Sequence, residues 1–245
     1  TITDWSAVIT GLLLGLTLPP SFPLWMTFVG GVIAIALGKA AFGGLGYNVF
    51  NPALVGRAVL QAAFPVAITT WSPAMVIGRF TYLPNSTLAI PFMTPEVDGF
   101  TGATPLSAFK FDGIQTDTAE LALGLITGST GETCALLILL GGLYLVVRNM
   151  MNWRIPVAIL TTVFVFSGVL HLVDSTAYPS PLFMLMAGGL MLGAVFMATD
   201  MVASPLTPLG VVLYGVLIGV LVVVIRLWSG LPEGVMYAIL LANAV

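Results

Sequence analysis

The stretch MVASPLTPLGVVLYGVLIGVLVVVI, residues 201–225, decides the class of this protein. It contains no Asp, Glu, Lys or Arg, and a membrane-spanning helix needs about 20 predominantly apolar residues. Further uncharged runs cover residues 5–38, 58–78, 133–147, 155–173, 175–199 and 234–245. These runs are continuous and do not alternate between polar and apolar residues, which favours helices over the strands of a β-barrel.

The composition of the whole chain points to the same class. Charged residues make up 7% of the 245 residues and hydrophobic residues 58%, with a mean hydropathy of +1.08. A soluble domain carries about 25% charged residues, so a soluble enzyme domain and a disordered regulator are excluded. The 7 Lys and Arg are too scattered to bind nucleic acid. One Cys, Cys134, and one His, His171, exclude a disulfide framework and predict no metal site.

We therefore expect an all-α polytopic membrane protein, surrounded by lipid, with about eight hydrophobic helices. They lie near residues 4–18, 22–41, 52–71, 132–149, 154–174, 181–199, 209–229 and 233–245. The chain divides into membrane helices of a first half (1–71), an intervening segment (72–131) and membrane helices of a second half (132–245). It starts without Met and ends inside the apolar run YAILLANAV, so we expect further segments beyond both ends.

Segment 72–131 differs from the rest of the chain. It holds 7 of the charged residues and several prolines, and a structureless loop of this length is uncommon unless it is functional or disordered. Its aromatic residues argue against disorder. We therefore expect one folded extramembrane segment that carries function.

The distribution of Lys and Arg predicts the orientation, because cytoplasmic connections are enriched in these residues. Arg148 and Arg154 flank the short connection RNMMNWR, which we expect on the cytoplasmic side. Counting spans from there puts Lys39 and Arg57 on the same side and segment 72–131 on the outer, periplasmic side. Arg226 falls at an outer helix end, against the rule.

Two long stretches share an order of parts. GGVIAIALGKAAFGGLGYNVFNPALVGRAVL (30–60) and GGLMLGAVFMATDMVASPLTPLGVVLYGVL (188–217) each contain a Gly-Gly helix, a polar break and another apolar run. Interrupted units of this kind are typical of two related helical repeats with a ligand site at the breaks. The alternative is that Gly-rich membrane helices resemble one another by composition alone.

The first motif of chemical interest is DGFTGATPLSAF, residues 98–109. Gly99 and Gly102 permit tight backbone turns, and Thr101 and Thr104 offer hydroxyl groups. Successive backbone N–H groups in such a turn can hold a phosphate. From the residues alone, however, an ordinary Gly/Thr turn is the favoured interpretation.

TGAT preceded by DGF closely resembles the flavin-attachment sequence of two related membrane subunits. They are the D subunit of the Rnf ion-translocating oxidoreductase and the B subunit of the sodium-translocating NADH:quinone reductase. In that family the last Thr of an (S/T)-G-A-T motif carries FMN through a phosphoester bond. The resemblance implies covalent FMN on Thr104. The surrounding cofactor-binding residues would be Asp98, Gly99, Thr101, Gly102 and Ala103.

The resemblance covers most of the chain from about residue 25. It extends to GSTGETCALLILLGG (128–142), NWRIPVA (152–158), FMATDMVASPLTPLG (196–210) and PEGVMYAILLANA (232–244). It is specific, because several unusual motifs occur in the same order. Thr101, where many relatives have Ser, is a mild variation.

The second motif is GGLGYNVFNPALVGRA, residues 43–58. Asn48 and Asn51 could cap a helix that has Pro52 at its first position. In the family that the chain resembles, two Asn at this spacing lie close to a second, non-covalent flavin near the cytoplasmic side. Asn48 and Asn51 are therefore candidates both for helix capping and for contact with this flavin, riboflavin or FMN.

Three acidic residues lie beside apolar runs. Asp200 could bind a cation, assist proton transfer or contact the second flavin, because an acid near membrane depth is a functional candidate by default. Capping a cytoplasmic turn is the favoured alternative. Glu132 fits a capping box with Ser129 or Thr130, and Glu233 suits a helix start.

Taken together, the resemblance implies a membrane electron-transfer subunit of an ion-translocating oxidoreductase complex of Rnf type. The ion would be Na⁺ or H⁺, and the chain would not be catalytic alone. Its partners would be other subunits, including a second FMN-bearing subunit, with a flavin transferase for maturation, in the bacterial inner membrane. The B subunit of the quinone reductase is an alternative within the family. A solute channel or transporter without a redox role is an alternative of another class.

Overall fold

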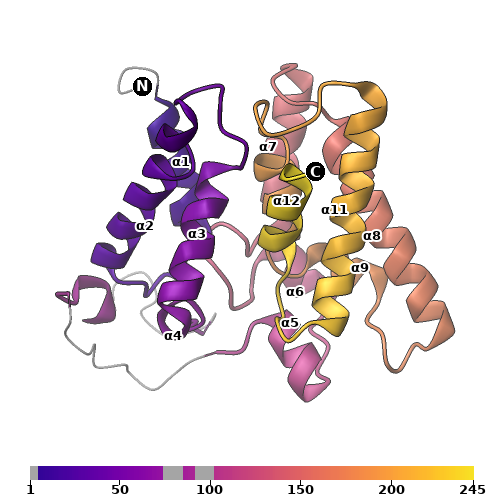
Figure 1. Cartoon of the computed structure of the whole chain (residues 1–245). Helices are drawn as coiled ribbons and strands as arrows, with labels where there is room; N and C mark the ends of the chain where they lie inside the picture. Colours follow the sequence, from indigo (N-terminus) through magenta and orange to yellow (C-terminus); the bar gives the residue numbers. More distant parts are fainter. Residues whose placement is uncertain (1–4, 74–84, 92–101) are drawn as a thin grey trace.

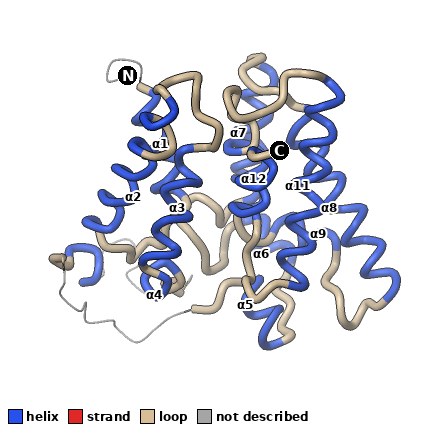
Figure 2. The backbone as a smooth tube through the Cα atoms, viewed as in Figure 1, coloured by secondary structure: helices blue, strands red, loops and turns tan. Residues whose placement is uncertain are grey.

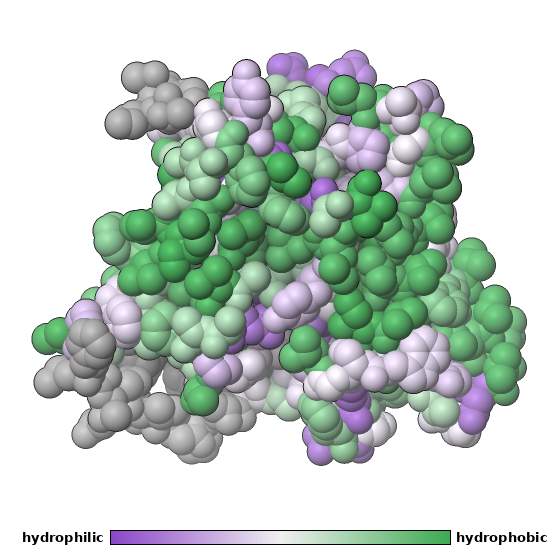
Figure 3. All heavy atoms as spheres, in the orientation of Figure 1, coloured by the Kyte–Doolittle hydropathy of each residue, from purple (hydrophilic) through white to green (hydrophobic). Residues whose placement is uncertain are grey.

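The computed structural model describes residues 5–73, 85–91 and 102–245. Every regular element within these ranges is a helix (Figures 1 and 2). Among the described residues, three helical stretches are long and apolar enough to cross a membrane: Leu24–Phe42, Arg154–Val173 and Pro208–Trp228. Figure 3 shows apolar side chains forming a broad band across the middle of one face, with hydrophilic side chains above and below it. The expected all-α membrane class is confirmed.

The helices form a group from each half of the chain (Figure 1). The first group contains α1 (Ser6–Leu16), α2 (Leu24–Ala36), the short helix η1 (Ala40–Phe42), α3 (Pro52–Ala63) and α4 (Pro65–Ile68). The second contains α7 (Ala135–Val147), α8 (Arg154–Val173), α9 (Pro181–Met186), α10 (Leu190–Leu192), η4 (Gly193–Met197), α11 (Pro208–Trp228) and α12 (Val235–Asn243). Between them in sequence lie η2 (Asn85–Leu88), α5 (Pro105–Ser107), η3 (Ala108–Asp112) and α6 (Thr118–Leu123).

Each of the eight expected hydrophobic segments contains helix. Only three meet the length and hydropathy of a membrane span within the described ranges, and α1 and α7 are shorter apolar helices. The count of eight spans therefore stays a prediction.

Glycines let the first group pack closely. A Cβ atom on Gly30 of α2 would lie 2.4 Å from Cδ1 of Leu60, and one on Gly56 of α3 would lie 2.7 Å from the carbonyl oxygen of Gly30. Small residues permit such close helix approach in membrane proteins, where packing replaces the hydrophobic effect. The second group uses the same device, since a Cβ atom on Gly215 of α11 would lie 2.5 Å from Cβ of Ala158 in α8.

The expected helix near residues 181–199 is broken. α9 ends at Met186, Ala187 is extended and Gly188 has a φ of +66°, before α10 begins at Leu190. Non-helical backbone at membrane depth is tolerated only where its polar groups find partners. Here Arg226 donates hydrogen bonds to the carbonyl oxygens of Met184 (2.6 Å) and Ala187 (2.9 Å). The backbone N–H of Gly189 donates to Oε2 of Glu233 at 3.0 Å.

These hydrogen bonds explain why Arg226 stands at an outer helix end, although Lys and Arg are enriched on the cytoplasmic side. Its side chain is 1% exposed and also pairs with Glu233, with 3.1 Å between Nη2 and Oε1. Glu233 in turn accepts from the backbone N–H of Gly234 at 3.2 Å, directly before α12. The prediction that Glu233 marks a helix start is confirmed, and the same carboxylate also holds the break between α9 and α10.

The described part of segment 72–131 packs against the second group. Leu106, Leu121 and Ile126 form a buried cluster with Phe183 and Ala187 of the broken helix. Lys110 of η3 donates hydrogen bonds to the carbonyl oxygens of residues 226, 229 and 231, at 2.5–2.9 Å. Burial lowers the pKa of the Lys110 ammonium from its ordinary value. The chain after Thr104 is therefore fixed to the end of α11.

Candidate functional site

Thr104 lies at the start of α5, after a turn in which a side chain at position 102 would crowd Thr127. The backbone N–H of Gly102 donates to the carbonyl oxygen of Trp71 at 2.8 Å. A Cβ atom on Gly102 would lie 2.9 Å from Oγ1 of Thr127 and 3.3 Å from Cα of Pro73. Thr104 has an extended backbone and caps α5, its hydroxyl accepting from the N–H of Ser107 at 3.3 Å.

The motif around Thr104 is described in part. Gly102 and Thr104 are partly exposed, and Ala103 is exposed. Asp98, Gly99 and Thr101, which the resemblance implies as cofactor-binding residues, lie outside the described residues. The three that are described come together in one turn beside a cavity.

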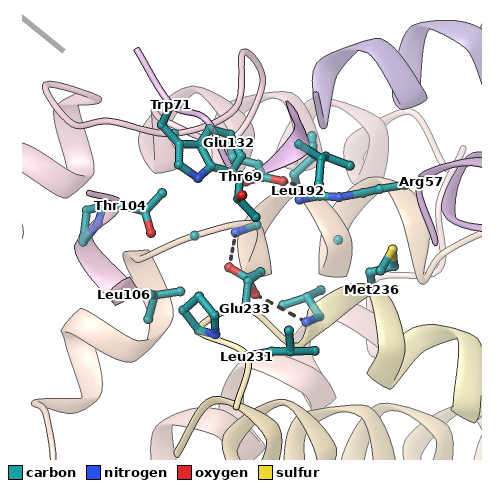
Figure 4. A pocket seen from close by; sticks show the side chains of 18 of the residues that line it. Arg57, Thr69, Trp71, Thr104, Leu106, Glu132, Leu192, Leu231, Glu233 and Met236 are labelled. Atoms are coloured by element: carbon teal, nitrogen blue, oxygen red, sulfur yellow. Dashed lines mark hydrogen bonds and ion pairs between the residues drawn. The ribbon is translucent and has the colours of Figure 1, made fainter. Parts of the chain in front are cut away.

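This cavity has a volume of about 120 Å³ and reaches from Thr104 into the helix bundle. Figure 4 shows Thr104 and Arg57 on opposite sides of it, with Glu132 and Glu233 between them. Both halves of the chain contribute to its wall. Its lining includes Arg57, Thr69, Trp71, Thr104, Leu106, Glu132, Leu192, Leu231, Glu233 and Met236.

An ion pair closes the side of the cavity that lies across from Thr104. Nη1 of Arg57, in α3, lies 2.8 Å from Oε1 of Glu132, and the two side chains are 12% and 7% exposed. The capping role expected for Glu132 is wrong, because α7 begins after Cys134 without a side-chain cap. The carboxylate lies against the helix break instead, since a Cβ atom on Gly189 would be 2.7 Å from its Oε1.

A polar cluster brings together the three residues expected near the second flavin, with Asn48 and Asn51 buried and Asp200 partly exposed. Nδ2 of Asn48 donates to Oδ2 of Asp200 at 3.4 Å, although 152 positions separate them. Asn51 donates from Nδ2 to the carbonyl oxygen of Met197 at 3.1 Å. Asn48 and Asn51 are 5% and 3% exposed.

The capping interpretation holds for Asn51 and Asp200 but not for Asn48, whose Nδ2 donates to the carbonyl oxygen of Phe50 and to Asp200. Oδ1 of Asn51 accepts from the N–H groups of Ala53 (3.0 Å) and Leu54 (3.3 Å) at the start of α3. Oδ1 of Asp200 accepts from the N–H of Val202 at 3.1 Å in the following turn. Capping uses only part of the hydrogen-bonding capacity of Asn51, because its amide nitrogen also contacts the second half of the chain.

The cluster and the cavity share a wall. Met197, whose carbonyl oxygen accepts from Asn51, also lines the cavity, as does Leu54. Asn51 and Arg57 are six residues apart on α3, which corresponds to about 9 Å along a helix. The two candidate sites therefore lie next to each other along one helix.

Known proteins place these features in a family. A sequence model described as the NQR2, RnfD, RnfE family matches residues 1–245. The chain is 44% identical to the D subunit of the proton-translocating ferredoxin:NAD(+) oxidoreductase complex of Clostridium ljungdahlii, covering 100% of this chain and 72% of that protein. It is 41% identical to the D subunit of the Na(+)-translocating ferredoxin:NAD(+) oxidoreductase complex of Acetobacterium woodii, covering 99% and 69%.

The chain belongs to the NQR2, RnfD, RnfE family. The resemblance seen in the motifs is confirmed, and it extends over the whole chain rather than from residue 25. A further relative is the D subunit of the ion-translocating oxidoreductase complex of Alcanivorax borkumensis, 41% identical over 99% of this chain and 72% of that protein. One of these relatives is named proton-translocating and another Na(+)-translocating. The family therefore includes complexes named for either ion.

Among the residues that line the cavity beside Thr104, Arg57, Trp71 and Glu132 were not predicted from sequence to belong to the site. Arg57 and Glu132 are 75 positions apart, and Trp71 stands near the end of an apolar run. The only signal for the ion pair was that each partner is a single charge beside an apolar run, which is a functional candidate in a membrane protein.

Proposed function

We propose that this chain is a membrane electron-transfer subunit that carries covalent FMN on Thr104 in an ion-translocating oxidoreductase complex of Rnf type. The observation that carries the proposal is the placement of Thr104. Its partly exposed hydroxyl lines a cavity that ends in a buried Arg57–Glu132 pair. Thr104 lies in the TGAT motif of a chain that matches the NQR2, RnfD, RnfE family over its full length.

The residues around Thr104 suit a flavin phosphate and one end of its ring system. Thr104 would provide the phosphoester oxygen, while Gly102 holds the turn close to Trp71 and Thr127. Leu106, Leu192 and Met236 line the cavity and exclude water. When bound, the flavin would supply one- or two-electron transfer, and the protein would place it and adjust its potential.

A second, non-covalent flavin, riboflavin or FMN, is proposed at Asn48, Asn51 and Asp200. The support is that these polar groups gather from both halves of the chain into one cluster, in which Asn48 and Asn51 are buried and Asp200 is partly exposed. The shared wall at Met197 and Leu54 would bring the two flavins close enough for electrons to pass through one layer of side chains.

The chain would work only within a complex. Relatives are named as D subunits of ion-translocating oxidoreductase complexes, which favours the Rnf type over the quinone reductase. We propose other subunits as partners, including a second FMN-bearing subunit, and a flavin transferase that makes the bond at Thr104. The location would be the bacterial inner membrane, with segment 72–131 on the outer side.

The two halves are proposed to be related repeats. Twice in the described structure an Arg of an apolar helix pairs with a Glu that precedes an apolar helix: Arg57 with Glu132 before α7, across the two halves, and Arg226 with Glu233 before α12, within the second half. Repeats of this kind also occur in transporters. At the break of α9, however, Arg226 and Glu233 already use the backbone groups that a solute would need.

The experiment is flavin fluorescence on a denaturing gel after expression with the flavin transferase. Thr104→Val keeps the size of the side chain and removes the hydroxyl, so its band should lose all covalent flavin fluorescence while the protein still inserts. Thr101→Val is the matched control and should keep the fluorescence. A dark wild-type band, or a bright Thr104→Val band, would overturn the proposal.

A further inference from the structure

Arg57 has hydrogen-bonding capacity that the described structure does not use. Its Nη1 binds Glu132, while its Nε is buried and has no hydrogen-bond partner among the described residues. A buried donor without a partner costs free energy, so such groups call for an explanation. Arg57 lines the cavity across from Thr104, so the cavity is where a partner could bind.

The second buried pair shows what a purely structural arginine does here. Arg226 holds two carbonyl oxygens of the broken helix as well as Glu233, and it does not line the cavity beside Thr104. Its Nε also lacks a partner among the described residues, but the helix break already explains its burial. α3 is continuous from Pro52 to Ala63, and in the described part of the chain Arg57 binds the carboxylate of Glu132 rather than a carbonyl oxygen of the broken helix.

The free groups at this end of the cavity define the chemistry of a ligand. Arg57 offers a cationic donor, and beside it Glu132 offers an acceptor, since only Oε1 of its carboxylate has a hydrogen bond in the described structure. The pyrimidine edge of a flavin ring is complementary, because an N–H donor stands there between two carbonyl acceptors. A cavity of about 120 Å³ is smaller than pockets for whole ligands of roughly 300–1,000 Å³, so part of the FMN would lie outside it.

We propose that Arg57 and Glu132 bind the pyrimidine edge of the flavin that Thr104 carries, and that they set its reduction potential. This inference rests on the proposed function. Reduction places negative charge on that edge of the flavin. Charge-assisted hydrogen bonds are strong in a low dielectric, so Arg57 favours the reduced flavin and Glu132 opposes it.

The test is a redox titration of the purified complex, followed by absorbance. The covalent flavin is isolated by subtracting the titration of the Thr104→Val complex. Arg57→Gln should lower the ratio of reduced to oxidised flavin at a fixed potential by about tenfold, which is about 30 mV for two electrons. Glu132→Gln should raise the same ratio. Arg154→Gln makes the same change of charge at an exposed helix start and should leave the ratio unchanged.

A purely structural ion pair would not shift the flavin potential in opposite directions when Arg57 and Glu132 are changed in turn. Opposite shifts therefore distinguish control of the potential from a structural role. Unchanged potentials in both variants, or shifts in the same direction, would overturn the inference. If Arg57→Gln fails to assemble, Glu132→Gln decides alone: a raised ratio supports the inference, and an unchanged or lowered ratio contradicts it. Covalent flavin is measured on the same samples by gel fluorescence. A dark wild-type band would therefore contradict the proposed attachment of FMN to Thr104, and not the inference about Arg57 and Glu132.

Discussion

At Gly102 the chain passes so close to Pro73 and Thr127 that a side chain has no room. The backbone N–H of Gly102 also donates to the carbonyl oxygen of Trp71, and this hydrogen bond fixes the turn before Thr104. The glycine of the motif therefore has a steric function that can be separated from the chemistry of the threonine hydroxyl.

We expect Gly102→Ala to reduce covalent FMN several-fold, because the new Cβ atom would displace the turn from Thr127. Fluorescence per unit of protein on a denaturing gel measures the loss. Adding Thr127→Ala removes the two closest atoms and should restore part of the signal. Ala119→Ser, at an exposed position of α6 outside the motif, is the control. Full incorporation in Gly102→Ala would contradict the steric account.

Asn51 combines two roles that one substitution can separate. Ser caps a helix about as well as Asn, but it lacks the amide that reaches the carbonyl oxygen of Met197. We expect Asn51→Ser to lose non-covalent flavin from the purified complex but to lose less thermal stability than Asn51→Ala, because it keeps the cap. Wild-type flavin stoichiometry in Asn51→Ser would leave Asn51 as a helix cap only.

At the scale of elements, the break between α9 and α10 depends on one side chain from α11. Arg226→Met would leave the carbonyl oxygens of Met184 and Ala187 without donors and Glu233 without its counter-ion. A buried carbonyl oxygen left without a donor costs about 1–3 kcal/mol, and Arg226→Met would strand two of them, so we expect a large fall in Tm. Thermal unfolding of the protein in detergent measures it, with the exposed Arg154→Met as control. An unchanged Tm would show that the break does not need Arg226.

Only part of this architecture could be predicted from sequence. Helical class and helix positions followed from the uncharged runs, and Thr104, Asn48, Asn51 and Asp200 followed from motifs. The break at Gly188 could not be located, because its polar groups are satisfied by residues 226 and 233, far along the chain. The Arg57–Glu132 pair was missed for the same reason, since a contact over 75 positions leaves no local pattern.

For the whole molecule, the two halves meet around the cavity and the polar cluster. The first half supplies Asn51, which caps α3, and Arg57 within α3. The second half supplies Met197, the last residue of η4, and Asp200, three residues later. Residues from both halves of the chain therefore line the cavity on which the proposed function rests. The account depends on the cofactor being attached at Thr104.

Mass spectrometry of the purified chain tests that attachment most directly. Cleavage after Arg79 and Lys110 releases a peptide of residues 80–110 that contains both Thr101 and Thr104. We predict that this peptide carries one FMN in phosphoester linkage and that fragmentation places it on Thr104. An unmodified peptide, or FMN located on Thr101, would contradict the account.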